Sequence, residues 1–171
     1  MKTKFVLALI SVFVLTAMIG LNANASQTED SDNHTVTFDV KPAIEIEVQE
    51  STYNFGDVDP IGSPYYTPQD AITVNVKCNT NWTLRVKGEG NFSNGSDEVP
   101  LSRLEWMEDW NGNENDWDGT EMTTSDVDVT SGTQTSNSGT DVKMEYRLTI
   151  TYEDPVGDNY ATTIVYTGTV S

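Results

Sequence analysis

Residues 142–152 read VKMEYRLTITY, and every second side chain of this stretch is apolar or aromatic. The residues between them are charged or carry a hydroxyl group. Side chains of a β-strand alternate between its two faces, so this period of two predicts a strand with one face on a core and the other in water. A second alternating run, from Tyr160 to Val170, follows the turn-forming residues 153–159. We expect the two runs to pair as long strands that close the fold.

The same alternation recurs in the middle of the chain. Apolar side chains occupy every second position of residues 72–78, and Trp82, Leu84 and Val86 continue the pattern after residues 79–81. We expect a hairpin whose apolar face, including Trp82, lies on the core. Cys78 is in phase with this face, which predicts a buried, inert thiol rather than a reactive or intermolecular one.

Two shorter alternating runs come first in the domain, residues 35–40 and 44–48, and Pro42 separates them. Proline has no N–H to give to a sheet, so it indicates a bend or an edge position. We expect residues 35–40 to pair with the chain's own sheet. The alternative is that they add to the edge of a neighbouring molecule's sheet, as donor strands do.

Outside residues 1–25, no segment shows the 3.6-residue period of an amphipathic helix. We therefore predict an all-β protein, an antiparallel immunoglobulin-like β-sandwich of about seven to nine strands over residues 35–171. Residues 108–141 are an exception, because they hold nine Asp or Glu and no Lys or Arg. For them we predict a long exposed acidic excursion, with at most a short strand near Val127 and Val129.

The start of the chain has the pattern of an export signal. Lys2 and Lys4 precede an apolar run, and Ala23-Asn24-Ala25 has the small-x-small form of a cleavage site. An uncleaved anchor helix is the alternative interpretation, because the run is long enough to cross a bilayer. We predict a signal peptide at residues 1–25, a flexible leader at residues 26–34, and a secreted or cell-surface protein without a membrane span after processing.

Composition excludes several classes of function. With 27 acidic and 9 basic residues the formal charge is −18, which argues against nucleic acid as a partner. One Cys and one His cannot build a thiolate zinc site, and His34 lies in the predicted leader, away from any Ser or Cys nucleophile. We therefore expect no enzyme activity and no cofactor apart from calcium.

Calcium and sugar ligands are the two candidates in the acidic excursion. Asp109, Asn111 and Asn113 have the alternate spacing of an oxygen-ligand loop, which Asp116 and Asp118 could complete, although Glu114 stands where such loops carry Gly. A solvated acidic loop is the simpler alternative. Trp110 and Trp117 would suit a surface glycan if their rings are exposed beside these polar side chains; otherwise they anchor the loop.

Several stretches resemble bacterial or archaeal surface modules. FGDV (55–58), ITVNVKCNTNWTL (72–84), PVGDNY (155–160) and IVYT (164–167) are similar to the strands of WxL-type, spore-coat-U and fimbrial-like domains. The residues 82–84 supply one Trp-x-Leu, and residues 164–166 read Ile-Val-Tyr where a second would stand. The resemblance implies a β-sandwich that is displayed on a surface or polymerises, and its WxL part implies peptidoglycan binding.

These observations together predict an exported structural or adhesive protein of a cell envelope or extracellular assembly. Its expected partners are other envelope proteins or copies of itself. The competing prediction is a non-catalytic carbohydrate-binding module that uses Trp110 and Trp117.

Overall fold

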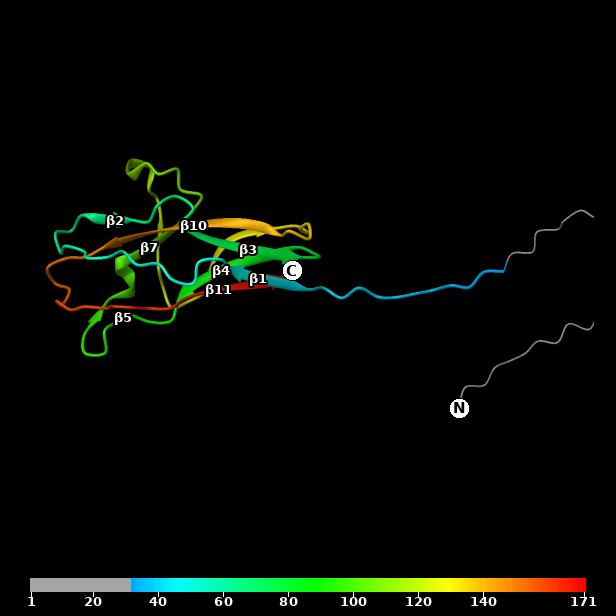
Figure 1. The fold of residues 1–171 in the computed structure, drawn as a ribbon, viewed down its shortest axis with the longest axis horizontal. Coiled ribbons are helices and arrows are strands. Elements are labelled where there is room, and N and C mark those ends of the chain that lie inside the picture. The colour runs from blue at the N-terminus through cyan, green and yellow to red at the C-terminus, as the bar shows by residue number, and fades with distance from the viewer. Residues whose placement is uncertain (1–31) are drawn as a thin grey trace, which may run out of the picture. The chain divides into compact units, whose positions relative to one another are not determined.

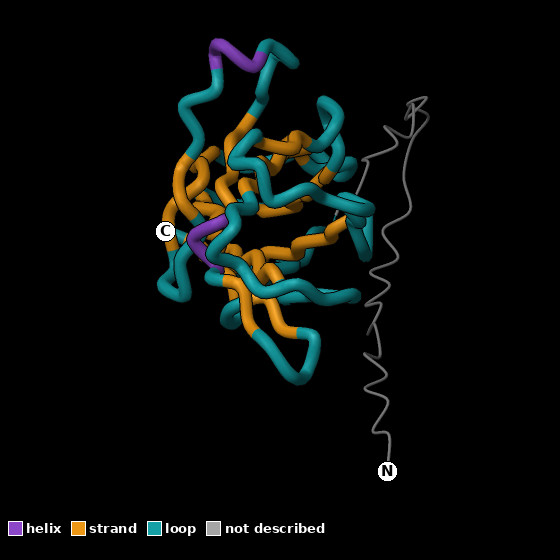
Figure 2. The backbone as a smooth tube through the Cα atoms, turned by 90° about the vertical axis from the view of Figure 1, so that its left-hand side faces the viewer, coloured by secondary structure: helices purple, strands orange, loops and turns teal. Residues whose placement is uncertain are grey.

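The computed structural model describes residues 32–171, and residues 39–171 form one compact unit. Its strands are antiparallel and build two main layers, with the loops and the two short 3₁₀ turns outside them (Figures 1 and 2). The prediction of an all-β sandwich is therefore confirmed. The predicted signal peptide at residues 1–25, and most of the predicted leader, lie outside the described residues.

The larger sheet has the strand order β1-β3-β10-β7-β8, and β2 pairs with the far end of β10. Its strands are β1 (Ile44–Val48), β2 (Pro64–Tyr66), β3 (Ile72–Cys78), β7 (Leu104–Glu108), β8 (Thr120–Glu121) and β10 (Thr140–Thr149). The smaller sheet has the order β11 (Ile164–Val170), β4 (Trp82–Gly88) and β9 (Val127–Gly132). A separate hairpin joins β5 (Phe92–Ser93) and β6 (Glu98–Val99), and the 3₁₀ turns are η1 (Leu101–Arg103) and η2 (Glu114–Asp116).

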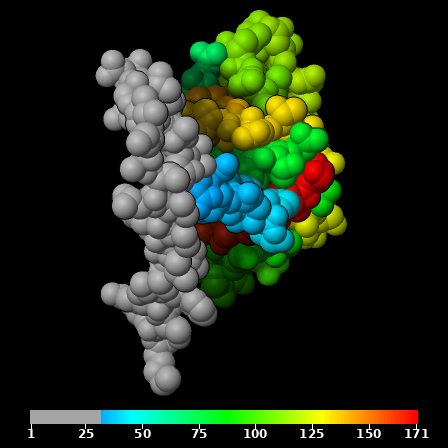
Figure 3. Space-filling model, turned by 90° about the vertical axis from the view of Figure 1, so that its right-hand side faces the viewer, coloured from blue at the N-terminus to red at the C-terminus, as the bar shows by residue number. Residues whose placement is uncertain are grey.

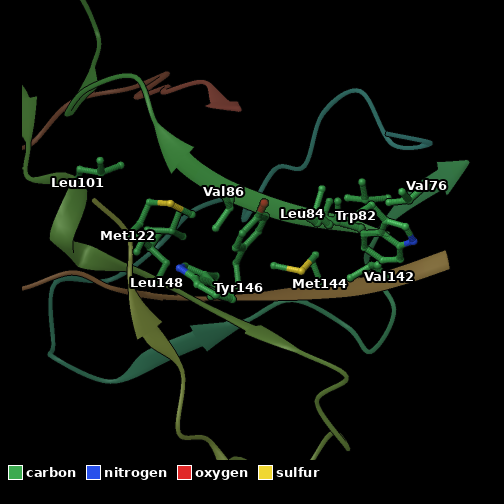
Figure 4. Close-up of a cluster of buried hydrophobic side chains, with 14 of the residues drawn as sticks. Val76, Trp82, Leu84, Val86, Leu101, Met122, Val142, Met144, Tyr146 and Leu148 are labelled. Carbon is green, nitrogen blue, oxygen red and sulfur yellow. The ribbon is translucent and has the colours of Figure 1, made fainter. Parts of the chain in front are cut away.

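The core lies between β10 of the larger sheet and β4 of the smaller one. Every second residue of each strand points inward, and these side chains meet between the two strands in Figure 4. They are Val142, Met144, Tyr146 and Leu148 from β10, and Trp82, Leu84 and Val86 from β4. Burial of side chains of this size, at about 1.5–3 kcal/mol each, is the main favourable contribution to folding.

Two predicted hairpins are wrong. β3 and β4 are consecutive, but β3 pairs with β1 and β10 while β4 pairs with β11 and β9. β10 and β11 are likewise in different sheets, so each pair is joined by a connection that crosses from one layer to the other. The apolar faces of β10 and β11 meet across the core instead of lying side by side. The hydroxyl groups of Tyr146 on β10 and Tyr166 on β11 are 2.5 Å apart. Cys78, in contrast, is buried as predicted.

The acidic excursion is more ordered than its composition predicts. The short strand expected near Val127 and Val129 is present as β9, which forms an edge of the smaller sheet beside β4. β8 and η2 are also part of this excursion. Within residues 32–171, the structure has no helix of the length and hydropathy needed to cross a membrane.

Candidate functional site

We call residues 35–40 the N-terminal arm. Val36, Phe38 and Val40 keep the alternation of a strand, yet they are 75%, 83% and 72% exposed. The arm forms no strand, since the first strand of the described chain begins at Ile44. The expected pairing of these residues with the chain's own sheet is therefore wrong. Three large apolar groups at two-residue spacing remain in water.

Asn79 holds the backbone where the chain enters β1. Its side-chain amide donates to the carbonyl oxygen of Lys41 (2.8 Å), and its side-chain oxygen accepts from the N–H of Ala43 (2.8 Å). The backbone N–H of Asn79 also donates to the carbonyl of Ala43 (3.3 Å). The connection between the arm and β1 is thereby fixed to the end of β3.

We expect Asn79→Ala to release this connection. Two hydrogen bonds near the surface are lost, so the free energy of unfolding should fall by about 1 kcal/mol. Amide hydrogen exchange should become faster at Ala43, whose N–H loses its acceptor. Asn81→Ala is the matched control, because Asn81 lies in the same turn and its side chain makes no hydrogen bond within the described residues. Unchanged exchange at Ala43 would contradict the role of Asn79.

Two edge strands, β1 and β11, meet at one border of the sandwich. Each ends its own sheet, and β1 (cyan) lies beside the end of β11 (red) in Figure 3. Gly168 makes this approach close: a Cβ atom there would come within 2.7 Å of the Cδ1 atoms of Ile44 and Ile46. Glycine therefore lets the two isoleucines pack on the backbone of β11.

The hydrogen-bond register shows which groups of β11 point to the open border. Glu89 N–H donates to Thr163 O (2.9 Å) and Ser171 N–H donates to Asn81 O (3.0 Å). In an antiparallel pair, alternate residues turn both backbone groups toward the partner and the others turn them away. The even-numbered residues of β11 therefore direct N–H and C=O away from β4, to an edge that no strand of the described chain covers.

The other long edges are less open to a new strand. β1 carries Glu45, which pairs with Lys77 (3.3 Å), and Glu47, and both point to the solvent. β9 carries Asp128, which pairs with Arg85 (2.6 Å), and its pairing with β4 is irregular at Leu84 and Arg85. Charged side chains and bulges are the usual protection of sheet edges. β11 reads IVYTGTV and has neither.

Trp110 and Trp117, the candidate glycan ligands, pack against the larger sheet. Trp110 is 6% exposed and stacks on Tyr66, with ring centroids 5.1 Å apart. Trp117 is half-buried and meets both rings edge-on, while the Arg147 guanidinium lies 5.4 Å from its centroid. The ring N–H of Trp110 donates to Asn113 O (3.0 Å), and that of Trp117 to Glu105 Oε2 (2.8 Å). Of the two interpretations of these tryptophans, the structure agrees with the loop anchor: both rings hold the excursion on the outer face of the larger sheet.

Glu145 is a buried residue whose position the sequence pattern does not predict. It lies on the face of β10 predicted to be in water, but it is fully buried. Its two carboxylate oxygens accept from the backbone N–H groups of Asp70 (2.7 Å) and Trp110 (3.1 Å). Burial raises the pKa of this carboxyl, and the two N–H groups act against that rise. One side chain thus ties two loops to the sheet.

The candidate calcium ligands are used within their own loop. The amide groups of Asn111 and Asn113 both donate to Asp116 Oδ2 (2.9 Å each). The side-chain oxygens of the two asparagines accept from backbone N–H groups two residues further on (2.8 and 3.1 Å). Asp109 and Asp118 are exposed. Over residues 32–171 no three His, Cys, Asp or Glu side chains come together in a way that could hold a metal, so calcium binding stays a prediction.

Comparison with family models and curated proteins gives no relative on which a function could be based. No protein-family model matches the sequence, and no curated protein matches it either. The resemblance to WxL-type, spore-coat-U and fimbrial-like domains therefore stays an expectation. The N-terminal arm and the border formed by β1 and β11 are the features that remain for a functional interpretation.

Proposed function

We propose that this protein is an exported structural subunit of a cell envelope or extracellular assembly, and that it associates with copies of itself through the N-terminal arm. The observation that carries the proposal is the exposure of Val36, Phe38 and Val40 on a segment with strand alternation. A solvent-exposed apolar strand without a partner is a template for pairing with another chain.

The net charge sets the conditions for association. Copies of a chain whose sequence has 27 acidic and 9 basic residues repel one another at low ionic strength. At 0.1 M salt, the repulsion between charges more than about 10 Å apart is largely screened. Salt does not weaken the contacts between apolar side chains. Association should therefore become stronger as salt is added.

Sedimentation velocity of the secreted protein tests the proposal. We expect oligomers whose proportion increases with protein concentration and with sodium chloride. Phe38→Asp should weaken association by about tenfold or more, because it puts a charge where an apolar side chain must be buried.

The matched control is Tyr152→Asp, which introduces the same charge at an aromatic residue of equal exposure, 82% against 83%. It lies in the loop after β10, outside the arm, and should leave association unchanged. A secreted protein that stays monomeric at high concentration and high salt would refute the proposal. An equal loss in both variants would show that added charge, and not the arm, is the cause.

A further inference from the structure

We infer that the free edge of β11 accepts the N-terminal arm of a second copy, which adds a fourth strand to the smaller sheet. This inference rests on the proposed function and assigns the acceptor surface for it. The occupant is residues 35–40 of another molecule of the same chain. The alternative acceptor is the neighbouring edge of β1.

Charge separates the two acceptors. The arm carries Asp39, and a strand added to β1 would bring it beside Glu47 and the Glu45–Lys77 pair. Like charges directly opposite each other destabilise a strand pair. The side chains of β11 that point away from the core are Val165, Thr167 and Thr169, none of which is charged. The chain has 27 acidic residues, but none of them is among the seven residues of β11. An arm that carries Asp39 can therefore pair with β11 without a like charge opposite it.

The faces of the two segments also match. Residues directly opposite in a strand pair point to the same side of the sheet. Ile164 and Tyr166 pack on the core, so Val36, Phe38 and Val40 would continue that apolar face, and Thr35 and Thr37 would lie beside the threonines on the outer face. Uncovered apolar surface is present at this border, where Val170 is 43% and Val48 is 39% exposed. The six-residue arm is close in length to the seven residues of β11.

The hydrogen bonds of Asn79 fix the point from which the arm extends. Only residues 41–43 connect the arm to β1, and their backbone is bonded to Asn79 at the end of β3. β3 belongs to the sheet opposite β11. Residues 35–40 form no strand within the described chain, and the acceptor we assign to them is the smaller sheet of another molecule.

Disulfide trapping between two differently tagged chains tests the assignment. One preparation carries Thr37→Cys in the arm. The other carries Val165→Cys, Thr167→Cys or Thr169→Cys on β11, three positions that sample the register. A disulfide forms only where the two Cβ atoms come within about 3.5–4.5 Å. The native Cys78 is 5% exposed and stays in all chains, so wild type mixed with each variant gives the background.

Glu47→Cys on β1 is the matched control acceptor, because it is an exposed, outward-pointing residue of the rival edge. We expect at least one β11 variant to give about tenfold more mixed dimer with Thr37→Cys than Glu47→Cys gives. Equal or greater trapping at Glu47→Cys, or no trapping on β11 in a protein that assembles, would overturn the assignment and leave the proposed function standing. A link that forms only within single chains of the double variant Thr37→Cys/Thr167→Cys would overturn it too. Absence of assembly by sedimentation would instead refute the proposed function itself.

Discussion

Replacing Trp82 with alanine is expected to lower the free energy of unfolding by about 3–5 kcal/mol, the cost of removing a buried tryptophan from a packed core. The ring is 3% exposed and lies between β4 and β10 (Figure 4). Its Nε1–H donates to the carbonyl oxygen of Thr133 (2.8 Å), so the variant leaves both a cavity and an acceptor without its donor. Denaturant unfolding followed by far-ultraviolet circular dichroism measures the loss. A change below about 1 kcal/mol would show that the ring does not fill the core.

A second substitution shows whether the ring covers the neighbouring strand as the structure describes. Trp82 is directly opposite Gly132 of β9, and a Cβ atom on Gly132 would lie 2.6 Å from the ring. Gly132→Ala should therefore cost about 1–3 kcal/mol in the wild type, because a rigid ring cannot move aside. In the Trp82→Ala background the same change should be close to neutral. Additive costs in the double variant would contradict the contact.

Strands and their buried faces were predictable from sequence, but their partners were not. Alternation correctly places Trp82, Leu84 and Tyr146 on the core. The same alternation arises whether two consecutive strands pair side by side or face each other across the core, because each has one apolar face in either case. Residues 79–81 therefore predicted a hairpin where the structure has a crossing between sheets.

The candidate site was predicted less well than the fold, for two physical reasons. Residues 35–40 have strand alternation, but alternation does not determine whether a segment pairs with a strand of its own chain. Alternation placed Glu145 in water, and the polar composition of the acidic excursion gave no sign that Trp110 would cover it. The rings of Tyr66, Trp110 and Trp117 supply enough apolar area for the excursion to fold over the larger sheet. The Glu145 carboxylate is buried beneath it.

Glu145→Ala is expected to cost about 2–4 kcal/mol of unfolding free energy, because it removes the acceptor of two backbone N–H groups. The group of Trp110 is buried and that of Asp70 is partly buried, so water replaces the carboxylate poorly. Amide exchange should accelerate at both residues. Glu105→Ala is a suitable comparison, since Glu105 lies on the same face but binds the side chains of Trp117 and Arg147 and no backbone group. Protection that survives in Glu145→Ala would show that the loops are held by other contacts.

Glu145→Gln isolates the charge of this side chain, because glutamine has nearly the same shape as the protonated carboxyl. Burial, followed by the nearby charges of Asp70 and Asp109, raises the pKa of Glu145 above its ordinary value of 4.5. Between these two pKa values the folded state holds more protons than the unfolded state, so the stability of the wild type falls as the pH rises. Glutamine does not titrate and escapes this fall. The free energy of unfolding of the variant, minus that of the wild type, should therefore increase with pH from 4.5 upward and become constant above the raised pKa. A difference that stays flat or declines across this range would mean that the carboxylate is as well stabilised in the folded protein as in water.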